Sequence, residues 1–192
     1  MIMDAQAKTR VTFEEYDALP ETNQIVELIE GEIVANPPNF RHQKTVLQII
    51  AVLLPLDLEG ELCIAPVGLH FDDGNSFEPD LFWVSPHNTA CALEPAGRYW
   101  HGAPDLVIEI LSPSTALNDR GVKFDTYEKY GVREYWLVDP EAKFTEVYRH
   151  DGSRFARVGL FKPGQPFESA ALGGAAINTE MWFAAREGGK DG

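Results

Sequence analysis

Short blocks of apolar and polar residues follow one another along the chain, and their period changes between about two and about 3.6 residues. Residues 24–29 and 32–35 alternate in character on either side of a Glu-Gly turn, which predicts a β-hairpin. Residues 41–54 instead carry apolar side chains at helical spacing, and Asn39 is placed to cap this helix at its N-terminus. The succession of short strands and helices predicts a mixed α/β fold.

The remaining elements follow from the same signals of period, caps and turns. Strands are expected at residues 61–71, 80–84, 106–111, 135–138, 144–149 and 154–160. Helices are expected at residues 12–20 and 118–130, and residues 85–103 show no clear period and are expected to form a long loop. The polar tail from Glu187 is expected to fray. These elements predict a single domain over residues 1–192, with its core between about residues 10 and 185.

The composition is that of a folded, acidic protein. Hydrophobic residues make up 44% of the 192 residues, and no apolar run approaches the roughly 18 residues that span a bilayer. The net charge of −14 argues against broad nucleic-acid binding, because contacts to phosphates need Lys and Arg. A local basic groove around Arg41, Lys44, Arg120 and Lys129 would nevertheless favour nucleic acid. The same acidity suits a site that gathers carboxylates around a divalent cation.

The cysteines and the first residues bear on the cellular compartment. The first ten residues contain no apolar stretch of the kind found in a signal peptide. Cys63 and Cys91 are therefore expected to be free thiols in a reducing cytoplasm. We expect a cytoplasmic protein that does not interact with a membrane.

The residue that points most directly to chemistry is Glu109, which lies inside the otherwise apolar run of residues 106–111. Such a run predicts a strand buried on both faces, where an ionised carboxylate needs a cation or hydrogen-bond donors opposite it. Asp105 lies on the same strand face, but four residues at about 3.3 Å each separate the two by about 13 Å, too far to share one metal ion. Asp80 begins a different strand, and adjacent strands about 4.8 Å apart would bring it close to Glu109.

The helix that follows this strand supplies a candidate cation. Asp119, Lys123 and Tyr127 share one side of it, and Lys123 lies about one turn from its start. There the ammonium can face Glu109 and orient or deprotonate a water molecule, or balance charge on a phosphoryl transition state. Two structural interpretations stay open: Glu109 pairs with Lys123 without any metal, or Lys123 is a solvated helix residue.

A Pro-Asp pair, then an acidic residue within an apolar strand, then a lysine resembles the PD-(D/E)XK nuclease superfamily. Residues 27–32, 41–43, 78–80, 104–115 and 119–140 more closely resemble the Uma-type family of restriction endonucleases. The resemblance covers residues 10 to 185. It implies a restriction-endonuclease-like mixed sheet flanked by α-helices, with additional β-hairpins. It also implies hydrolysis of phosphodiester bonds that depends on Mg²⁺ or Mn²⁺, with DNA as the expected substrate.

The resemblance also implies roles for individual residues. Asp80 and Glu109 match the metal-binding acids of the superfamily. Its motif has a lysine two residues after the glutamate, where this chain has Leu111, and the family resemblance places the catalytic lysine on the helix as Lys123.

Two further catalytic candidates come from the resemblance alone. Glu27 matches the early glutamate of the family, and His42 matches its histidine. Each also has a plain structural interpretation, Glu27 as the water-facing residue of a strand and His42 as a polar residue at a helix end.

Three functions stay open from the sequence. The first is a metal-dependent endonuclease. The second is a non-catalytic binding or assembly module with a nuclease-like core, which the net charge of −14 and Leu111 favour. The third is a hydrolase of a small phosphorylated compound, whose metal chemistry would be similar. We also expect a homodimer or higher homo-oligomer, because hairpin strands near the C-terminus and the loop with Tyr99 and Trp100 would present an apolar surface.

Overall fold

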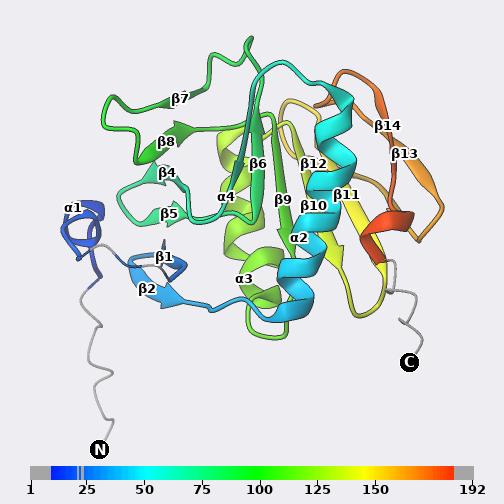
Figure 1. Ribbon diagram of the computed structural model, residues 1–192. Helices are drawn as coiled ribbons and strands as arrows, with labels where there is room; N and C mark the ends of the chain where they lie inside the picture. The colour runs from blue at the N-terminus through cyan, green and yellow to red at the C-terminus, as the bar shows by residue number, and fades with distance from the viewer. Residues whose placement is uncertain (1–9, 21, 23, 184–192) are drawn as a thin grey trace, which may run out of the picture.

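The computed structural model describes residues 10–20, 22 and 24–183. Its described strands form two six-stranded sheets and one two-stranded sheet (Figure 1). In spatial order, the first sheet contains β2 (Glu32–Ala35), β1 (Val26–Ile29), β5 (Asn75–Phe77), β4 (Gly68–Asp72), β8 (Tyr99–Gly102) and β7 (Cys91–Leu93). The second contains β12 (Phe155–Phe161), β11 (Phe144–His150), β10 (Glu134–Asp139), β9 (Leu106–Ile110), β6 (Leu81–Val84) and β3 (Glu61–Ile64). The small sheet pairs β13 (Pro166–Ser169) with β14 (Ala175–Asn178).

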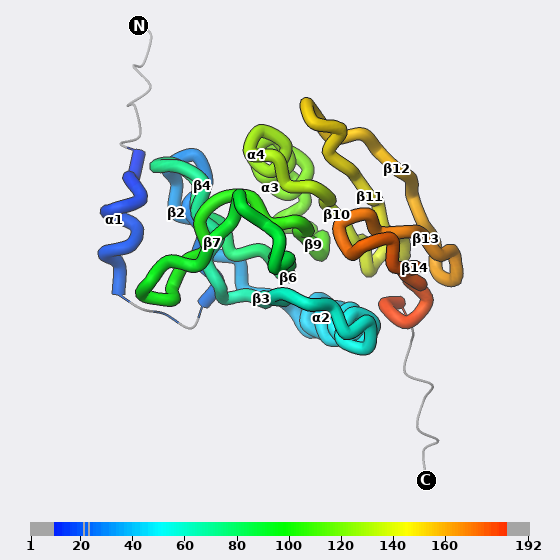
Figure 2. The backbone as a smooth tube through the Cα atoms, turned by 90° about the horizontal axis from the view of Figure 1, so that it is seen from above, coloured from blue at the N-terminus to red at the C-terminus, as the bar shows by residue number. Residues whose placement is uncertain are grey.

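The second sheet lies between two layers of helix. The helices are α1 (Phe13–Asp17), α2 (Phe40–Leu53), α3 (Ala116–Arg120) and α4 (Val122–Tyr130), with the 3-10 turns η1 (Leu54–Leu56) and η2 (Glu180–Phe183). One face of the second sheet packs against α2 and the other against α4, as the view from above shows (Figure 2). The predicted mixed sheet flanked by helices is therefore confirmed, with the additional hairpins forming a second large sheet. No helix in the described ranges is long and apolar enough to cross a membrane.

Strand β9 lies inside the second sheet, and all five of its residues are buried. It runs parallel to β10 and antiparallel to β6. Leu106 and Ile108 contribute to the core beneath α2, whereas Val107 contributes to the core on the side of α4. Burial on both faces explains why the run is apolar, and the alternation of side chains puts Glu109 on the side of α4.

Several elements were predicted correctly from local signals in the sequence. Glu30 and Gly31, between β1 and β2, have φ angles of 49° and 78°, as the two central residues of a type I′ hairpin turn require. Gly131 ends α4 with a φ of 83°, and its N–H donates to the carbonyl of Tyr127 at 3.1 Å, the predicted left-handed cap. Cys63 and Cys91 are free.

Residues 61–71 are not one strand, as predicted, but two strands in different sheets. Strand β3 pairs with β6 in the second sheet, and β4 pairs with β5 and β8 in the first. Pro66 separates them, because proline has no N–H to continue a ladder of backbone hydrogen bonds.

The predicted long loop at residues 85–103 was wrong, because this segment contains β7 and β8. Strand β8 pairs with β4, and β7 pairs with β8. The residues of β8 are all partly buried, so no alternation of apolar and polar residues marks the strand. Tyr99 and Trp100 lie in this strand and not in an exposed loop.

The helix predicted at residues 118–130 divides into α3 and α4. Gly121 separates them with a ψ of −108°, far from helical values. A Cβ atom at this position would lie 2.8 Å from the carbonyl oxygen of Leu117, so the close approach favours glycine. The tail from Glu187 lies outside the described residues, and the single-domain organisation stays a prediction.

Candidate active site

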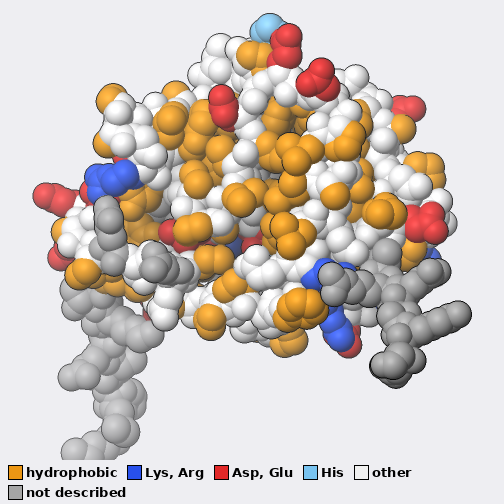
Figure 3. All heavy atoms as spheres, in the orientation of Figure 1, with side chains coloured by type: hydrophobic (Ala, Val, Ile, Leu, Met, Phe, Trp, Pro, Cys, Tyr) orange, Lys and Arg blue, Asp and Glu red, His pale blue; other side chains and the backbone are white. Residues whose placement is uncertain are grey.

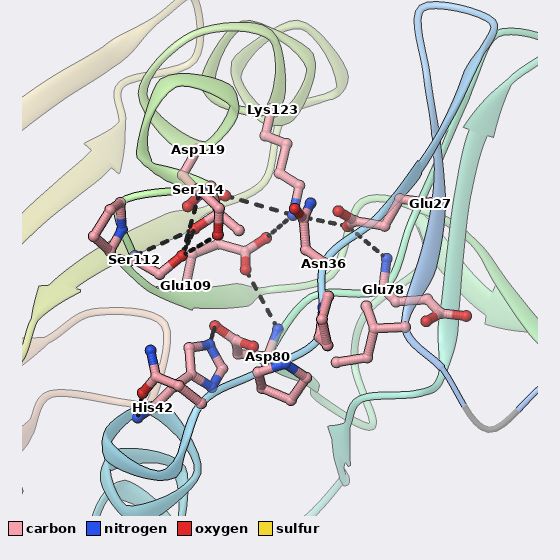
Figure 4. A pocket seen from close by; sticks show the side chains of 16 residues that line it. Glu27, Asn36, His42, Glu78, Asp80, Glu109, Ser112, Ser114, Asp119 and Lys123 are labelled. Atoms are coloured by element: carbon pink, nitrogen blue, oxygen red, sulfur yellow. Dashed lines mark hydrogen bonds and ion pairs between the residues drawn. The ribbon is translucent and has the colours of Figure 1, made fainter.

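A pocket opens where the N-terminus of α2, the start of β6, the end of β9 and the start of α4 meet (Figure 4). Its polar lining residues are Glu27, Asn36, Asn39, His42, Glu78, Asp80, Glu109, Ser112, Ser114, Thr115, Asp119 and Lys123. The five candidate site residues of the sequence, Glu27, His42, Asp80, Glu109 and Lys123, are all among them. They come from five different parts of the fold, so only the tertiary structure brings them together.

The pairing of β6 with β9 places Asp80 beside Glu109. The register pairs Leu81 with Ile108, so the residue before Leu81 meets the residue after Ile108. The two acids are joined through the backbone: Ile110 N–H donates to Asp80 Oδ2 at 2.7 Å, and Asp80 N–H donates to Glu109 Oε2 at 3.4 Å. Both side chains are buried, with 8% and 3% of the residue exposed. This is the convergence that the strand spacing predicted.

His42 holds Asp80 from the other wall of the pocket. Its Nε2 lies 3.0 Å from Asp80 Oδ2, and Asn39 fixes the first turn of α2 because its Oδ1 accepts from the His42 N–H at 3.0 Å. Since the ring contacts one carboxylate oxygen and is itself buried, His42 is a partner of Asp80 and not merely a polar residue at a helix end.

Lys123 extends from α4 to meet three carboxylates. Its Nζ lies 2.7 Å from Glu27 Oε1, 3.0 Å from Glu109 Oε1 and 3.5 Å from Asp119 Oδ1. Tyr127, one turn further along α4, donates its hydroxyl to Glu109 Oε1 at 2.8 Å. Lys123 and Glu27 are each only 3% exposed, so the interpretations of Lys123 as a solvated lysine and of Glu27 as a water-facing residue were wrong.

Burial of these groups, together with their charged neighbours, shifts their pKa values. Burial raises the pKa of Glu109 well above its usual range, and Lys123 only partly offsets this effect. Burial alone would lower the pKa of Lys123, but the carboxylates of Glu109, Glu27 and Asp119 outweigh burial and hold it well above its ordinary value. Burial raises the pKa of Asp119 to about 6. Lys123 is therefore an ammonium ion near neutral pH.

The pocket holds more negative charge than its own cation neutralises. Five acidic residues and one lysine line it: Glu27, Glu78, Asp80, Glu109, Asp119 and Lys123. Among the described residues the buried His42 Nδ1 has no hydrogen-bond partner, and the buried Asp119 Oδ1 has no hydrogen bond beside its 3.5 Å ion pair with Lys123 Nζ. Oxygen ligands of this kind suit Mg²⁺ or Mn²⁺, and Mg²⁺ commonly takes one or two carboxylates together with waters and substrate phosphates. The described part of the chain has no cluster of three or more His, Cys, Asp or Glu side chains already placed around a metal position.

Asp105 lies outside the pocket, as the strand spacing predicted. Its Oδ2 accepts from Ser85 N–H at 2.9 Å and from Asn88 Nδ2 at 2.8 Å, and its Oδ1 accepts from Arg133 at 2.8 Å. These contacts tie the start of β9 to neighbouring segments, so Asp105 is a structural residue.

Three of the four cations proposed for a basic groove lie beside acids. Arg41 pairs with Glu141, Arg120 Nη2 lies 2.6 Å from Glu146 Oε1, and Lys129 Nζ lies 3.5 Å from Asp72 Oδ2. These pairs reduce the positive potential that the groove would offer to phosphates.

Glu78 and Asp119 are the pocket acids to which no role was assigned from the sequence. Glu78 directly precedes the Pro-Asp pair, and burial raises its pKa to about 7, with the charge of Glu27 adding to the shift. Asp119 precedes Lys123 by four residues, and this spacing placed both residues on one side of the predicted helix. The spacing did not show that Asp119 is buried. The signal that could have identified both acids is their position in the sequence, because each lies within four residues of a residue assigned to the site.

This combination of a mixed sheet between helices and an acidic pocket with a buried lysine defines a protein of the restriction-endonuclease-like class. A model of the family Uma2, described as "Putative restriction endonuclease", matches residues 13–180, and the chain belongs to this family. The chain is also similar to a crystal structure described as a putative nuclease belonging to DUF820, from Anabaena variabilis ATCC 29413. The similarity has a TM-score of 0.70 at 24% identity and covers 90% of this chain and 97% of the other, which shows the shared fold. Among curated proteins, no match was found.

Proposed function

We propose that this protein is a metal-dependent endonuclease that hydrolyses phosphodiester bonds, with DNA as its substrate. The observation that carries the proposal is the juxtaposition of Asp80, directly before β6, with Glu109 on the adjacent β9, and of Lys123 Nζ 3.0 Å from the Glu109 carboxylate, in one pocket. Membership of the Uma2 family, whose description is "Putative restriction endonuclease", supports the same activity.

Asp80 and Glu109 are the residues that would hold Mg²⁺ or Mn²⁺. The fit rests on the surplus of carboxylates in the pocket, where five acidic side chains share one lysine. A bound divalent cation supplies Lewis acidity that polarises a phosphate oxygen and lowers the pKa of water.

The protein's own groups position the reactants. Hydrolysis forms a bond between a water oxygen and phosphorus, breaks one phosphorus–oxygen ester bond, and leaves a proton on the departing oxygen. Because the carboxylates around it keep Lys123 protonated, its ammonium orients the water and balances charge on the phosphoryl group, and it does not remove the proton. Glu27 and Tyr127 fix the position of Lys123 and Glu109, and His42 fixes Asp80.

Cleavage assays with isosteric variants test the proposal. Wild type should cut single-stranded or double-stranded DNA, or RNA, when Mg²⁺ or Mn²⁺ is added, and should be inactive in EDTA. Asp80→Asn and Glu109→Gln should each lower the cleavage rate by about 100-fold or more. Asp105→Asn, which changes a buried acid outside the pocket, is the matched control and should cut like wild type. Equal cleavage by wild type and both pocket variants would refute the assignment.

The second candidate function is a binding or assembly module that keeps the nuclease-like core without catalysis. The observation that favours it is electrostatic: the chain carries a net charge of −14, and Arg41, Arg120 and Lys129 each lie beside an acid. Titration calorimetry separates the two functions. Heat of Mn²⁺ binding that disappears in Glu109→Gln supports the nuclease, and no divalent binding at millimolar concentration supports the module.

A further inference from the structure

The outer face of α2 carries large apolar side chains that no described element covers. Its inner face packs Val46 and Ile49 onto the second sheet. On the outer side, Phe40 is 83% exposed, Leu47 is 66% exposed, and Leu54, the residue that follows α2, is 65% exposed. Figure 3 shows hydrophobic side chains gathered over this helix, and Figure 2 shows that α2 is an outer layer of the molecule. Three of the four most exposed large hydrophobic residues in the described part of the chain therefore belong to one face.

The same segment is free of acidic residues. The chain has 30 Asp and Glu residues, yet residues 33–56, which include all of α2, contain none and carry Arg41 and Lys44. Two copies of a chain with a net charge of −14 repel each other over most of their surfaces. Helix α2 therefore adds no carboxylate of its own to the repulsion between two copies that approach along it, although Glu141 lies beside Arg41 at one end and Asp57 follows Leu54 at the other.

The spacing of the three residues is symmetric. Phe40, Leu47 and Leu54 are seven residues apart, which is close to two helical turns, so they form one stripe along the helix. Leu47 is its midpoint. When two such helices pack antiparallel about a two-fold axis through this midpoint, Leu47 meets Leu47 of the second copy, and Phe40 meets Leu54 of the second copy. The contact is then self-complementary, as a two-fold interface requires.

The two ends of the stripe also differ in shape in a complementary way. Phe40 projects into solvent at one end. At the other end, Leu54 borders a largely apolar hollow of about 200 Å³, which Asp57 and Gly60 also line. Its other apolar lining residues are Leu53, Leu58, Leu62, Trp83, Leu106 and Leu172. An aromatic side chain that fills an apolar pocket on the partner is the usual form of an energetic anchor in protein interfaces.

We propose that this stripe, formed by Phe40, Leu47 and Leu54, is the contact surface of a two-fold symmetric homodimer. Asn39 caps the same helix and His42 lies in its first turn, so each pocket opens near one end of the paired helices. The proposal concerns assembly and does not depend on catalysis. Its test is a mass measurement, whose outcome is unaffected if no nuclease activity is found.

Sedimentation equilibrium at micromolar concentration tests the interface. Wild type should show twice the 21.4 kDa mass of one chain. Leu47→Glu should give the monomer mass, because two carboxylates would face each other at the axis. Leu93→Glu is the matched control: Leu93 is an exposed leucine, 49% exposed, on β7 of the other large sheet, and this variant should remain a dimer. Circular dichroism verifies that both variants are folded.

A mixture of opposite charges makes the test specific to the two-fold axis. Leu47→Glu and Leu47→Lys should each be monomeric alone and should form a dimer when mixed, because a residue on the axis meets its own copy. A monomeric wild type, a dimer unaffected by Leu47→Glu, or no rescue on mixing would overturn the proposal. A monomer that loses DNA binding on Phe40→Ala would also overturn it and assign the face to nucleic acid.

Discussion

Replacing Lys123 by methionine removes the only Lys or Arg among the residues that line the described pocket. Methionine keeps most of the chain length and the apolar stem, so the main change is the loss of the ammonium. Glu27, Glu109 and Asp119, now 2.7, 3.0 and 3.5 Å from Nζ, are left buried without a cation. The variant therefore isolates the contribution of charge pairing in the pocket.

The expected cost follows from the burial of these groups. Removing one partner of a buried ion pair destabilises a protein by about 3–5 kcal/mol, because the remaining charge is uncompensated. We expect a loss of this size at pH 8. The loss should shrink at lower pH, because burial has already raised the pKa of Asp119 to about 6 and that of Glu109 well above its usual range, so protonation relieves the unpaired charge.

Urea unfolding followed by tryptophan fluorescence measures this effect, since Trp136 and Trp182 are buried. The measurement is made in EDTA at pH 8 and again at pH 5.5. Lys129→Met is the matched control, because the Lys129 side chain is 66% exposed and lies 3.5 Å from Asp72 on the surface. Its cost should be much smaller than that of Lys123→Met and should not depend on pH in this range, because solvent screens the exposed pair.

A double-mutant cycle with Glu109→Gln separates the ion pair from a general loss of packing. Without the charge on Glu109, removal of the ammonium should cost less, and the coupling should be about 1–3 kcal/mol. If the two changes are additive within about 0.5 kcal/mol, or if the cost of Lys123→Met does not depend on pH, the electrostatic reasoning is refuted.

Two further predictions concern acids of different kinds. Burial raises the pKa of Glu78 from 4.5 to about 7, so between these pH values the folded protein keeps a proton that the unfolded chain has lost. The stability that comes from this proton is fully present below pH 4.5 and is lost as the pH rises through about 7. Urea unfolding in EDTA should therefore show Glu78→Gln to be more stable than wild type by about 1–3 kcal/mol at pH 8 and equally stable near pH 4.5. Equal stability of the two proteins at pH 8 would contradict this prediction. For Asp105, burial alone would raise the pKa, but hydrogen bonds from Ser85 and Arg133 hold it below 3.8. The stability that ionised Asp105 contributes is therefore present above that pH and is lost as the pH falls. Asp105→Asn should lower stability by about 1–3 kcal/mol at pH 7 without lowering the cleavage rate per folded molecule, and a loss of cleavage at full stability would give Asp105 a catalytic role.

The elements that the sequence predicted correctly are those with strong local signals. The apolar run around Glu109 predicted a strand buried on both faces, and all residues of β9 are buried. Gly131 ended its helix, and the Glu-Gly turn set the first hairpin. The segments that the sequence misjudged have no such signal: β7 and β8 are short and partly buried, and their pairing partners include a strand some thirty residues earlier in the chain.

For the candidate site, the sequence by itself determined which residue types were present and which pairing was impossible. The rise of an extended strand excluded Asp105 as a partner of Glu109, since that distance is fixed by backbone geometry. The sequence did not determine how many acids surround Lys123. Tertiary structure decided that, by burying Glu27 and Asp119 against the same ammonium. The reason is physical: the spacing within one strand or helix is set by local geometry, whereas the convergence of side chains from different elements depends on sheet register and packing.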